Sequence, residues 1–463
     1  MRHPYLAYLE PIVSRKHALG RLRRVLGARL LMVALVAIPL TGAVSPTNAS
    51  GHAGHAVRVT YYVDCDQGDD AYSGVQPIRA WRSLVRASAA ELQPSDRVLL
   101  KRGCTWTGPL VAAWSGTAYA PVEIGSYGRG NPPLIENARD DVLVTGSHLI
   151  IDGIAASSAA PMYDRTCADN PMGWRVGFHF AAGAHDNILR NSAASHQLFG
   201  VQVDGGSSRN QILYNRLIDN NMKSSNGKSD SGGVGVTLGG DANLVFHNYI
   251  AGSDMCSPLY GRDGAAVDVY GGRDNLIAYN TAVQNNNFAE VGNRRSFGNT
   301  FAYNVVRADE DIANFLVLHG LQDDNGPVYG TRVYNNTVYL TGRHSYAVQC
   351  GRGCTSAVLS LRNNIIWAER SIGFSDKPFD EGNNIYWRSD GRPVIWFRQS
   401  PSSRVANPQF VDAANGRMQL RPTSPAIAAG SWVGVAAGFR HDFVGTAVPQ
   451  RGTIDAGAYQ YPR

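Results

Sequence analysis

Long apolar runs, metal-binding cysteine motifs and unbalanced charge are all scarce in this chain. One apolar run, Leu30–Leu40, has eleven residues, which is too short to span a bilayer. None of the six cysteines forms a Cys-x-x-Cys pair, which argues against a structural zinc site. The first 49 residues hold seven of the 43 basic residues and one of the 37 acidic residues, so 36 of each remain. We therefore expect no nucleic-acid partner.

The N-terminal segment has the pattern of a signal peptide. A basic stretch ends at Arg29, the short apolar run follows it, and a small-residue site lies at Thr47-Asn48-Ala49. We expect residues 1–49 to be a targeting segment and the mature protein to be secreted, without stable membrane insertion. The alternative is an uncleaved membrane anchor, which the shortness of the apolar run disfavours.

A short motif ending in Asn recurs through the middle of the chain. Its copies are DNILRN ending at Asn191, NQILYN at Asn215, NLVFHN at Asn248, NLIAYN at Asn280, NTFAYN at Asn304, TRVYNN at Asn336 and VLSLRNN at Asn364. Successive final Asn residues are 24 to 33 residues apart. A repeat with this period is typical of a solenoid.

Each repeat has the pattern of strands. The 3.6-residue spacing of a helix is absent, while apolar and polar residues alternate around each Asn. The unit from Gly200 to Asn221 contains three short strand patterns, Val201–Val203, Gln211–Tyr214 and Arg216–Ile218. Three strands per coil predict a parallel β-helix. We expect the repeated Asn to adopt the left-handed backbone of a turn and to hydrogen-bond along the stack of coils.

With these repeats, the chain resembles the right-handed parallel β-helix proteins of the pectate-lyase-like superfamily. The resemblance covers residues 58–461. It implies an all-β fold, a single-stranded right-handed parallel β-helix with a small N-terminal α/β cap. That superfamily includes lyases, hydrolases, epimerases and non-catalytic adhesins, so the resemblance by itself selects no activity.

Both ends of the solenoid carry capping patterns. Tyr61–Asp64 and Arg97–Lys101 are strand-like, and Ala80–Leu92 has helical periodicity. We therefore expect a strand–helix–strand cap over residues 57–110, coils over 111–400 and a C-terminal capping segment over 401–463. A solenoid needs such caps because its end coils expose open β-edges.

Export makes the six cysteines candidates for disulfide bonds. Six cysteines allow about 15 pairings. The most economical set is Cys65–Cys104 across the cap, Cys167–Cys256 between two loops, and Cys350–Cys354 within one turn.

One outer sheet of the solenoid is the expected functional face, since side chains fill the core of a β-helix. Three long insertions precede strands of one sheet and end before Val176, Val234 and Ala265. Alternation in AAVDVYGG and NFAEVGN turns Asp268 and Glu290 outward from that sheet. Because their coils are adjacent, the two residues lie about 5 Å apart along the stack. Two carboxyl groups at so short a distance must share a cation, share a proton or differ in pKa.

Several polar residues on or beside this face complete the candidate site. Their types suit carbohydrate chemistry: carboxyls and a lysine for proton transfer, an arginine for substrate charge, and a tyrosine for stacking on sugar rings. The candidate catalytic residues are Asp268, Glu290, Arg262, Asp263 and Lys223; the candidate substrate-binding residues are Tyr270, His179, Asn293 and Arg294; and the candidate Ca²⁺ ligands are Asp263, Asp268 and Glu290. Ordinary interpretations are also open: Asp268 and Glu290 as solvated acids, Arg262 and Asp263 as a local ion pair that closes a loop, and Arg294 as a turn residue.

These residues favour an enzyme acting on a polysaccharide, by one of two chemistries. In a lyase, Ca²⁺ held by the three acids, or an arginine, would neutralise a substrate carboxylate while a base such as Lys223 removed the adjacent proton. In a glycoside hydrolase, Asp268 and Glu290 would act as acid and as nucleophile or base. The lyase is preferred, because the superfamily that the chain resembles is rich in lyases.

Two other functions remain open for a secreted, monomeric β-helix. The face could bind glycans without catalysis, as a cell-surface module, or the solenoid could be a scaffold without a ligand. Long loops tied by cysteines argue against the scaffold. A polygalacturonase is disfavoured, because the chain has an Asp-Asp at Asp323–Asp324 but no Gly-His-Gly and no Arg-Ile-Lys.

Overall fold

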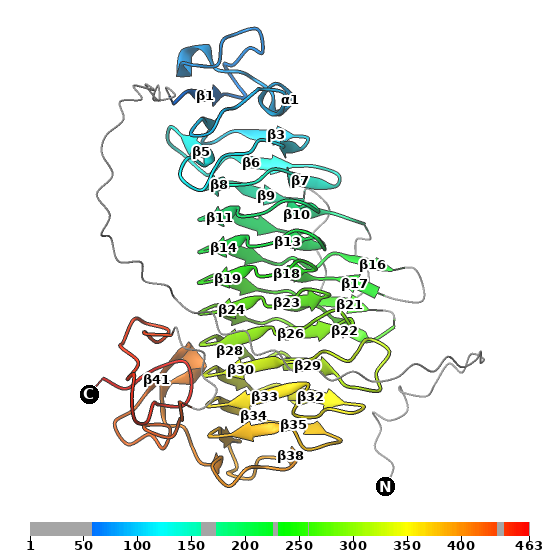
Figure 1. Cartoon of the computed structure of the whole chain (residues 1–463), viewed down its shortest axis with the longest axis vertical. Helices are drawn as coiled ribbons and strands as arrows, with labels where there is room; N and C mark the ends of the chain where they lie inside the picture. The colour runs from blue at the N-terminus through cyan, green and yellow to red at the C-terminus, as the bar shows by residue number, and fades with distance from the viewer. Residues whose placement is uncertain (1–57, 159–172, 226–229, 258, 433–438, 463) are drawn as a thin grey trace, which may run out of the picture. The chain divides into compact units, whose positions relative to one another are not determined.

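The computed structural model describes residues 58–158, 173–225, 230–257, 259–432 and 439–462. These residues wind into coils whose strands form three long parallel sheets, called here sheets A, B and C (Figure 1). Each coil passes from sheet C to sheet A and then to sheet B. The predicted parallel β-helix is confirmed.

Within each sheet, the strands stack in the order of the chain, so that each coil adds one strand to the stack. Sheet A consists of β1 (Thr60–Val63), β2 (Arg97–Lys101), β5 (Val122–Tyr127), β8 (Leu149–Asp152), β11 (Ile188–Arg190), β14 (Gln211–Leu213), β19 (Leu244–Phe246), β24 (Leu276–Ala278), β27 (Thr300–Ala302), β30 (Thr331–Tyr334), β33 (Leu359–Arg362) and β36 (Asp380–Gly382). Sheet B consists of β3 (Thr105–Thr107), β6 (Leu134–Glu136), β9 (Ala155–Ser157), β12 (Ala193–Ser195), β15 (Arg216–Ile218), β20 (Tyr249–Ala251), β25 (Thr281–Val283), β28 (Val305–Ala308), β31 (Thr337–Leu340), β34 (Ile365–Ala368), β37 (Ile385–Trp387) and β39 (Arg404–Val405). Sheet C consists of β4 (Leu110–Ala112), β7 (Asp140–Val144), β10 (Val176–Phe180), β13 (Phe199–Val203), β18 (Val234–Leu238), β23 (Ala265–Tyr270), β26 (Asn287–Gly292), β29 (Asn314–His319), β32 (Tyr346–Gly351), β35 (Ser371–Ser375) and β38 (Ile395–Trp396).

The core lies inside the coils and follows from alternation along each strand. In β23, for example, Val267 and Val269 are completely buried, while Asp268 between them keeps contact with solvent. Inward Val, Ile, Leu and Phe side chains of successive coils form one continuous apolar cluster. Full burial of each such side chain contributes about 1.5–3 kcal/mol, so the stack itself is the main source of stability.

A ladder of side-chain amides runs along the corner between sheets A and B. The backbone N–H and Nδ2 of Asn215 donate to Oδ1 of Asn248 at 2.9 and 3.0 Å, and Asn248 donates in the same way to Asn280. The ladder continues through Asn304, Asn336, Asn364 and Asn384. The predicted hydrogen bonding along the stack is therefore present, and it satisfies the buried corner amides.

The prediction that these Asn residues take the left-handed backbone is wrong for the copies from Asn215 onward. The residue before the Asn takes it instead: φ is 55° at Tyr214 and 54° at His247. In the first copy Asn191 itself has φ 50°, and Ser192 occupies the ladder position. The left-handed residue makes the bend and points outward, which leaves the following side chain directed into the corner.

Asn248→Ala is expected to destabilise the fold by about 3 kcal/mol, because it leaves several buried polar partners unsatisfied. The buried Asn248 donates to Ile212 O at 2.8 Å and to Asn280 Oδ1, and it accepts two bonds from Asn215. Urea unfolding followed by circular dichroism measures the change. The matched control is Asn131→Ala at an exposed position, where a change within about 0.5 kcal/mol is expected. Equal effects in the two variants would show that the ladder adds no stability.

The N-terminal elements include a helix much shorter than the predicted Ala80–Leu92. Helix α1 spans only Leu84–Ser88, preceded by a 3-10 turn, η2 (Pro77–Arg79). Ser83 caps α1 by accepting a hydrogen bond from Arg86 N. The residues before Ser83 are not free to be helical, because Trp81 forms a bridge to Val63 of β1. No helix in the described ranges is long and apolar enough to cross a membrane.

The C-terminal segment runs along the flank of the coils (Figure 1). It contains β40 (Phe410–Asp412), η3 (Ala413–Asn415) and β41 (Arg417–Leu420), and β40 pairs antiparallel with β41. Ala458 N donates to Thr337 Oγ1 at 2.8 Å, and Tyr279 Oη donates to His441 O at 2.7 Å. These contacts cover the outer surface of several middle coils.

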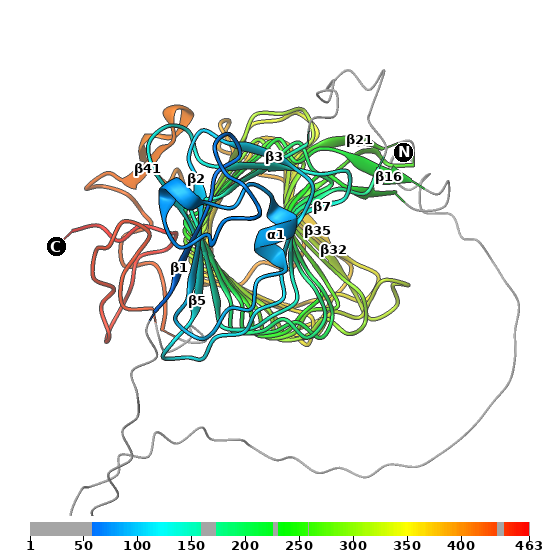
Figure 2. The same cartoon turned by 90° about the horizontal axis from the view of Figure 1, so that it is seen from above.

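Two hairpins project from the corner between sheets B and C (Figure 2). One is formed by β16 (Lys223–Ser225) and β17 (Asp230–Gly232), and the other by β21 (Met255–Ser257) and β22 (Gly261–Asp263). Ser257 Oγ donates to Asp230 Oδ2 at 2.5 Å, which ties the second hairpin to the first. The hairpins therefore flank one edge of sheet C, beside the strands that carry the predicted acids.

Candidate active site

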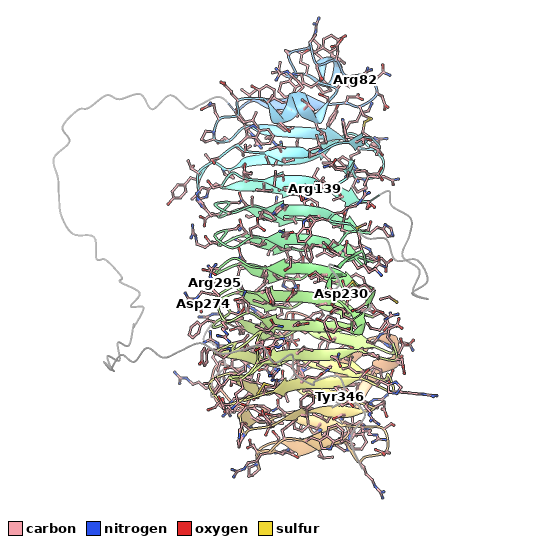
Figure 3. The ribbon with its side chains drawn as sticks, turned by 90° about the vertical axis from the view of Figure 1, so that its right-hand side faces the viewer. Arg82, Arg139, Asp230, Asp274, Arg295 and Tyr346 are labelled. Carbon is pink, nitrogen blue, oxygen red and sulfur yellow. A yellow bond between two sulfur atoms is a disulfide. The ribbon has the colours of Figure 1, made fainter. Side chains whose placement is uncertain are left out.

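The outward side chains of sheet C form a single row along the stack. Strand register aligns Asp268 of β23 with Glu290 of β26, next to Thr237 of β18 and Val317 of β29. The complete row is Val111, Leu143, His179, Gln202, Thr237, Asp268, Glu290, Val317, Gln349, Phe374 and Trp396. Figure 3 views the side on which the hairpins project, with Asp230 and Tyr346 labelled. The two predicted acids are thus direct neighbours on an outer face.

Asp268 lies in an environment that favours a neutral carboxyl. Burial first, and then repulsion from Glu290 and Asp263, raises the pKa of Asp268 well above its ordinary range, although His319 opposes the shift. Its Oδ1 is buried and has no hydrogen-bond partner among the described residues. The side chain as a whole keeps some contact with solvent, so a substrate can reach the carboxyl.

Asp263, the last residue of β22, is a second carboxyl whose pKa is raised. Burial raises the pKa of Asp263 to about 7, repulsion from Glu290 and Asp230 adds to the rise, and a hydrogen bond from Gly264 N at 2.8 Å opposes it. The hairpin therefore brings Asp263 close enough to influence the ionisation of Asp268 and to be repelled by Glu290 on sheet C.

Glu290 is held by a histidine that also contacts a third carboxylate. His319 Nε2 lies 3.2 Å from Glu290 Oε1, and His319 Nδ1 lies 3.1 Å from Asp323 Oδ1. Burial alone lowers the pKa of His319, but the hydrogen bond to Glu290 and the charges of Glu290 and Asp323 outweigh it and raise the pKa. Because both ring nitrogens face carboxylates, the site favours the imidazolium form of His319, which can donate to each of them.

Two tyrosines complete the surroundings of the acids. Tyr270 ends β23 and donates from Oη to Asn325 Oδ1 at 3.2 Å. Burial, followed by the charges of nearby acids, raises the pKa of both Tyr260 and Tyr270, so both phenols stay protonated. Their side chains are 63% and 47% exposed, which leaves ring surface available for contact with a sugar.

Arg262 has a structural partner in its own hairpin. Its Nε donates to Asp254 Oδ1 at 2.9 Å and a second nitrogen bonds Asp254 Oδ2, so the guanidinium grips a buried carboxylate. This pairing with Asp254 differs from the local pair with Asp263 that was considered from the sequence. The antiparallel hairpin explains it, since neighbouring residues of β22 point to opposite sides.

Lys223 lies on β16, opposite Gly232 of β17. The Lys223 side chain makes no ion pair with any other residue in the described part of the chain. The structure thus gives Lys223 no contact with Asp268 or Glu290. Lys228, in the same insertion, falls outside the described residues.

His179 belongs to a separate cluster on the same row. It is three strand spacings from Asp268, or about 14 Å. Its Nε2 lies 2.9 Å from Asp204 Oδ2 and its Nδ1 lies 3.2 Å from Asp140 Oδ1. Burial alone lowers the pKa of His179, but the hydrogen bonds and charges of the two aspartates raise it to about 9.

Asn293 and Arg294 lie in the turn after β26. Asn293 has φ 70° and accepts a hydrogen bond from Arg295 N at 3.0 Å, which is a turn-forming role. Arg294 is exposed. The next residue, Arg295, pairs with Asp241 at 3.1 Å, away from the acids of sheet C.

The disulfides Cys65–Cys104 and Cys350–Cys354 are both formed, as predicted. Cys167 of the third predicted pair falls outside the described residues. Disulfide bonds are typical of exported proteins, which is consistent with secretion.

His319 and Asp323 were not among the candidates selected from the sequence. A signal for His319 was available, since it ends β29 two residues after the outward Val317 and so points to the same side. The contact of Asp323 with His319 depends on the path of the loop after β29, which no short sequence pattern specifies.

The three candidate Ca²⁺ ligands offer the right atoms but do not converge. Carboxylate oxygens suit Ca²⁺, and Asp268 Oδ1 is unpartnered among the described residues. Within that part of the chain, the sets of three or more His, Cys, Asp or Glu whose ligand atoms all lie within 4.8 Å of one another are Asp64, Cys65, Asp66 and Cys104, and His148, His185 and Asp186. Asp263, Asp268 and Glu290 form no such set, so we derive no step through a metal.

Two open hollows of the surface lie away from the acids. One of about 360 Å³ is lined by Arg97, Arg102 and Glu123 on sheet A. Another of about 550 Å³ lies between His247 and Tyr279 and the C-terminal segment. An open sheet face suits a polymer better than either hollow does, because a polymer must extend beyond the site at both ends.

Comparison with known proteins defines the fold and not the activity. No protein-family model matches the chain, and no curated protein is significantly similar in sequence. Its structure is similar to pectate lyase Pel9A, with 17% identity over 88% of this chain and 98% of that chain, and a TM-score of 0.57. It is also similar to an alginate lyase from Paenibacillus sp. str. FPU-7 (15% identity, 69% of this chain, 96% of that chain, TM-score 0.45). A GH136 lacto-N-biosidase from Eubacterium ramulus gives 15% identity, 74% and 67% coverage and a TM-score of 0.42.

Proposed function

We propose that the protein is a secreted enzyme that hydrolyses glycosidic bonds of a polysaccharide on the outer face of sheet C. The observation that carries the proposal is the pairing of Asp268 with Glu290 on adjacent strands in unequal environments. Asp268 is half-buried with one carboxyl oxygen out of contact with solvent, its pKa is raised, and it therefore holds a proton. Glu290 accepts a hydrogen bond from an imidazolium. A proton donor beside a carboxylate is the arrangement that glycoside hydrolysis requires.

The two carboxyls have different roles in this reaction. Asp268 donates its proton to the glycosidic oxygen as the bond from that oxygen to the anomeric carbon breaks. The separation of one strand favours direct attack by a Glu290 oxygen on that carbon, which forms a glycosyl–enzyme ester. Water then cleaves the ester, its proton passes to the Asp268 carboxylate, and both residues return to their starting states. His319 holds Glu290 in place for each step.

Among the described residues, the imidazolium of His319 is held between Glu290 and Asp323, and no Arg or Lys side chain is available beside the acids to neutralise a substrate carboxylate, which makes hydrolysis a better fit than elimination. Within the described residues, Arg262 is engaged by Asp254 and Lys223 has no contact with the acids, so a substrate carboxylate would meet mainly negative charge. A neutral glycan avoids that repulsion. Exposed Tyr260 and Tyr270 provide rings on which it can stack.

A panel of neutral and uronic-acid polysaccharides tests the proposal. The purified protein is incubated with each, with Ca²⁺ or with a chelator, and both reducing ends and ultraviolet absorbance from unsaturated ends are followed. Reducing ends without absorbance support hydrolysis. Absorbance that requires Ca²⁺ would instead establish a lyase, and binding without cleavage would establish a glycan-binding module.

Asp263→Asn is expected to move the alkaline limb of the pH–rate profile to lower pH by about one unit. Hydrolysis needs protonated Asp268, so the rate falls as pH rises through the pKa of Asp268. Asp263 repels the Asp268 carboxylate, and removing that repulsion lowers the pKa of Asp268. The matched control is Asp324→Asn at an exposed position. An unchanged alkaline limb in Asp263→Asn would show that Asp268 is not the titrating acid.

A further inference from the structure

A turn closed by a disulfide lies against the loop that follows β29. The bond joins Cys350 and Cys354, which are both completely buried. Leu321 N of the loop donates to Gly353 O at 3.2 Å, and Gln322 N donates to Arg352 O at 2.8 Å. The loop thus rests on carbonyls that the disulfide holds in a small ring.

The contact between turn and loop is close and supported from behind. A Cβ on Gly320 would lie 2.4 Å from Gly351 O, so the first residue of the loop has no space for a side chain. On its other side, the turn donates from Gly353 N and Cys354 N to Asp376, at 2.8 and 3.1 Å. The turn is therefore fixed by one covalent bond and two hydrogen bonds.

The same loop carries the carboxylate that faces His319. Asp323 follows Gln322 directly, and its Oδ1 lies 3.1 Å from His319 Nδ1 and accepts from Asn325 N at 2.9 Å. Arg352 of the turn reaches Asp323 Oδ2 at 3.9 Å. Moving the loop would therefore move Asp323 relative to His319, and His319 is the group that holds Glu290.

We propose that the turn closed by Cys350–Cys354 is a positioning device, which fixes Asp323 and through it His319 and Glu290. The charged groups facing His319 are Glu290 from β26, Asp268 from β23 and Asp323 from the loop. Of these, Asp323 alone depends on the turn for its place. The consequence for turnover rests on the proposed function, but the positioning of His319 does not.

Titration of the His319 imidazole by NMR tests this inference without a substrate. The test variant carries Cys350→Ala and Cys354→Ala, and His319→Gln assigns the signal. The His319 pKa is expected to fall by about one unit, because the charge of Asp323 moves away. Asp323→Asn should lower it in the same direction. The matched control is Cys65→Ala with Cys104→Ala, which opens the other described disulfide and should leave the His319 pKa unchanged.

An unchanged His319 pKa in a folded Cys350→Ala/Cys354→Ala variant would overturn the inference, and so would an equal fall in the control. If the double variant does not fold, Asp376→Ala replaces it. That change removes the two hydrogen bonds behind the turn, and a fall of the same sign but smaller size is expected. If no glycan is cleaved, the titration still decides the positioning. If one is cleaved, kcat should fall about tenfold with KM unchanged.

Discussion

Asp268→Asn and Glu290→Gln are each expected to lower kcat by a factor of about 10² to 10⁴. An amide cannot donate the proton that the leaving oxygen needs, nor can it attack the anomeric carbon. KM should change little, because both substitutions keep the size and shape of the side chain. Release of reducing ends from the substrate identified in the panel measures the loss.

Glu91→Gln in the N-terminal region is the matched control, since it neutralises an exposed carboxyl far along the stack from β23 and β26. It should keep full activity. If Asp268→Asn and Glu290→Gln were as active as the control, the catalytic assignment would be wrong. Undiminished glycan binding with no turnover in any form, the unmodified protein included, would favour a binding module.

Asp141→Asn is expected to stabilise the protein by about 4 kcal/mol at pH 7 and to have little effect at pH 4. Asp141 is completely buried, where Asn137 N and Gln197 Nε2 each donate to it at 2.6 Å. Burial raises the pKa of Asp141 to about 9, and the charge of Glu136 adds to the rise, while the hydrogen bonds and Arg175 oppose it.

Asp141→Asn stabilises the protein at neutral pH because Asp141 takes up a proton when the chain folds. The pKa of Asp141 is higher in the folded protein than in the unfolded chain, so between about pH 4 and pH 9 folding binds a proton. Its contribution to stability is complete below that window and is lost as pH rises through it. An amide at this position has no proton to take up. It can donate to Gln197 Oε1, which has no partner among the described residues, once that side-chain amide rotates.

Urea unfolding at several pH values between 4 and 8 measures the effect. The unfolding free energy of the unmodified protein should decline with rising pH across this window. In Asp141→Asn the slope of that decline should be smaller, by an amount equivalent to the uptake of up to one proton on folding. Asp324→Asn, at an exposed position, is the control and should leave the slope unchanged. Equal slopes for Asp141→Asn and the unmodified protein would show that Asp141 is ionised in both states.

The position of the central acids could be predicted because it depends only on local alternation. Asp268 lies between two buried valines, and a residue on an exposed strand face must point away from them. The repeat then aligned it with Glu290, since parallel coils stack in register. No knowledge of distant segments was needed for either step.

The partners of those acids could not be predicted in the same way. Arg262 bonds Asp254 because the second insertion folds into an antiparallel hairpin, and His319 meets Asp323 because the loop after β29 turns back over the sheet edge. Both contacts are made by insertions outside the repeat. Hydrogen bonds and packing specific to each insertion decide their paths.

By itself, the sequence determined the parallel coils, the Asn ladder and the row of outward side chains, because each follows from a pattern repeated from coil to coil. It also determined two disulfides, because the most economical pairing of the cysteines selected them. Only the tertiary structure decided which residue of each corner takes the left-handed backbone, where the hairpins stand and which group holds Glu290. Those features depend on contacts between segments with no shared period. The chemistry of the face therefore comes from a periodic scaffold that supplies the acids and from aperiodic loops that set their protonation.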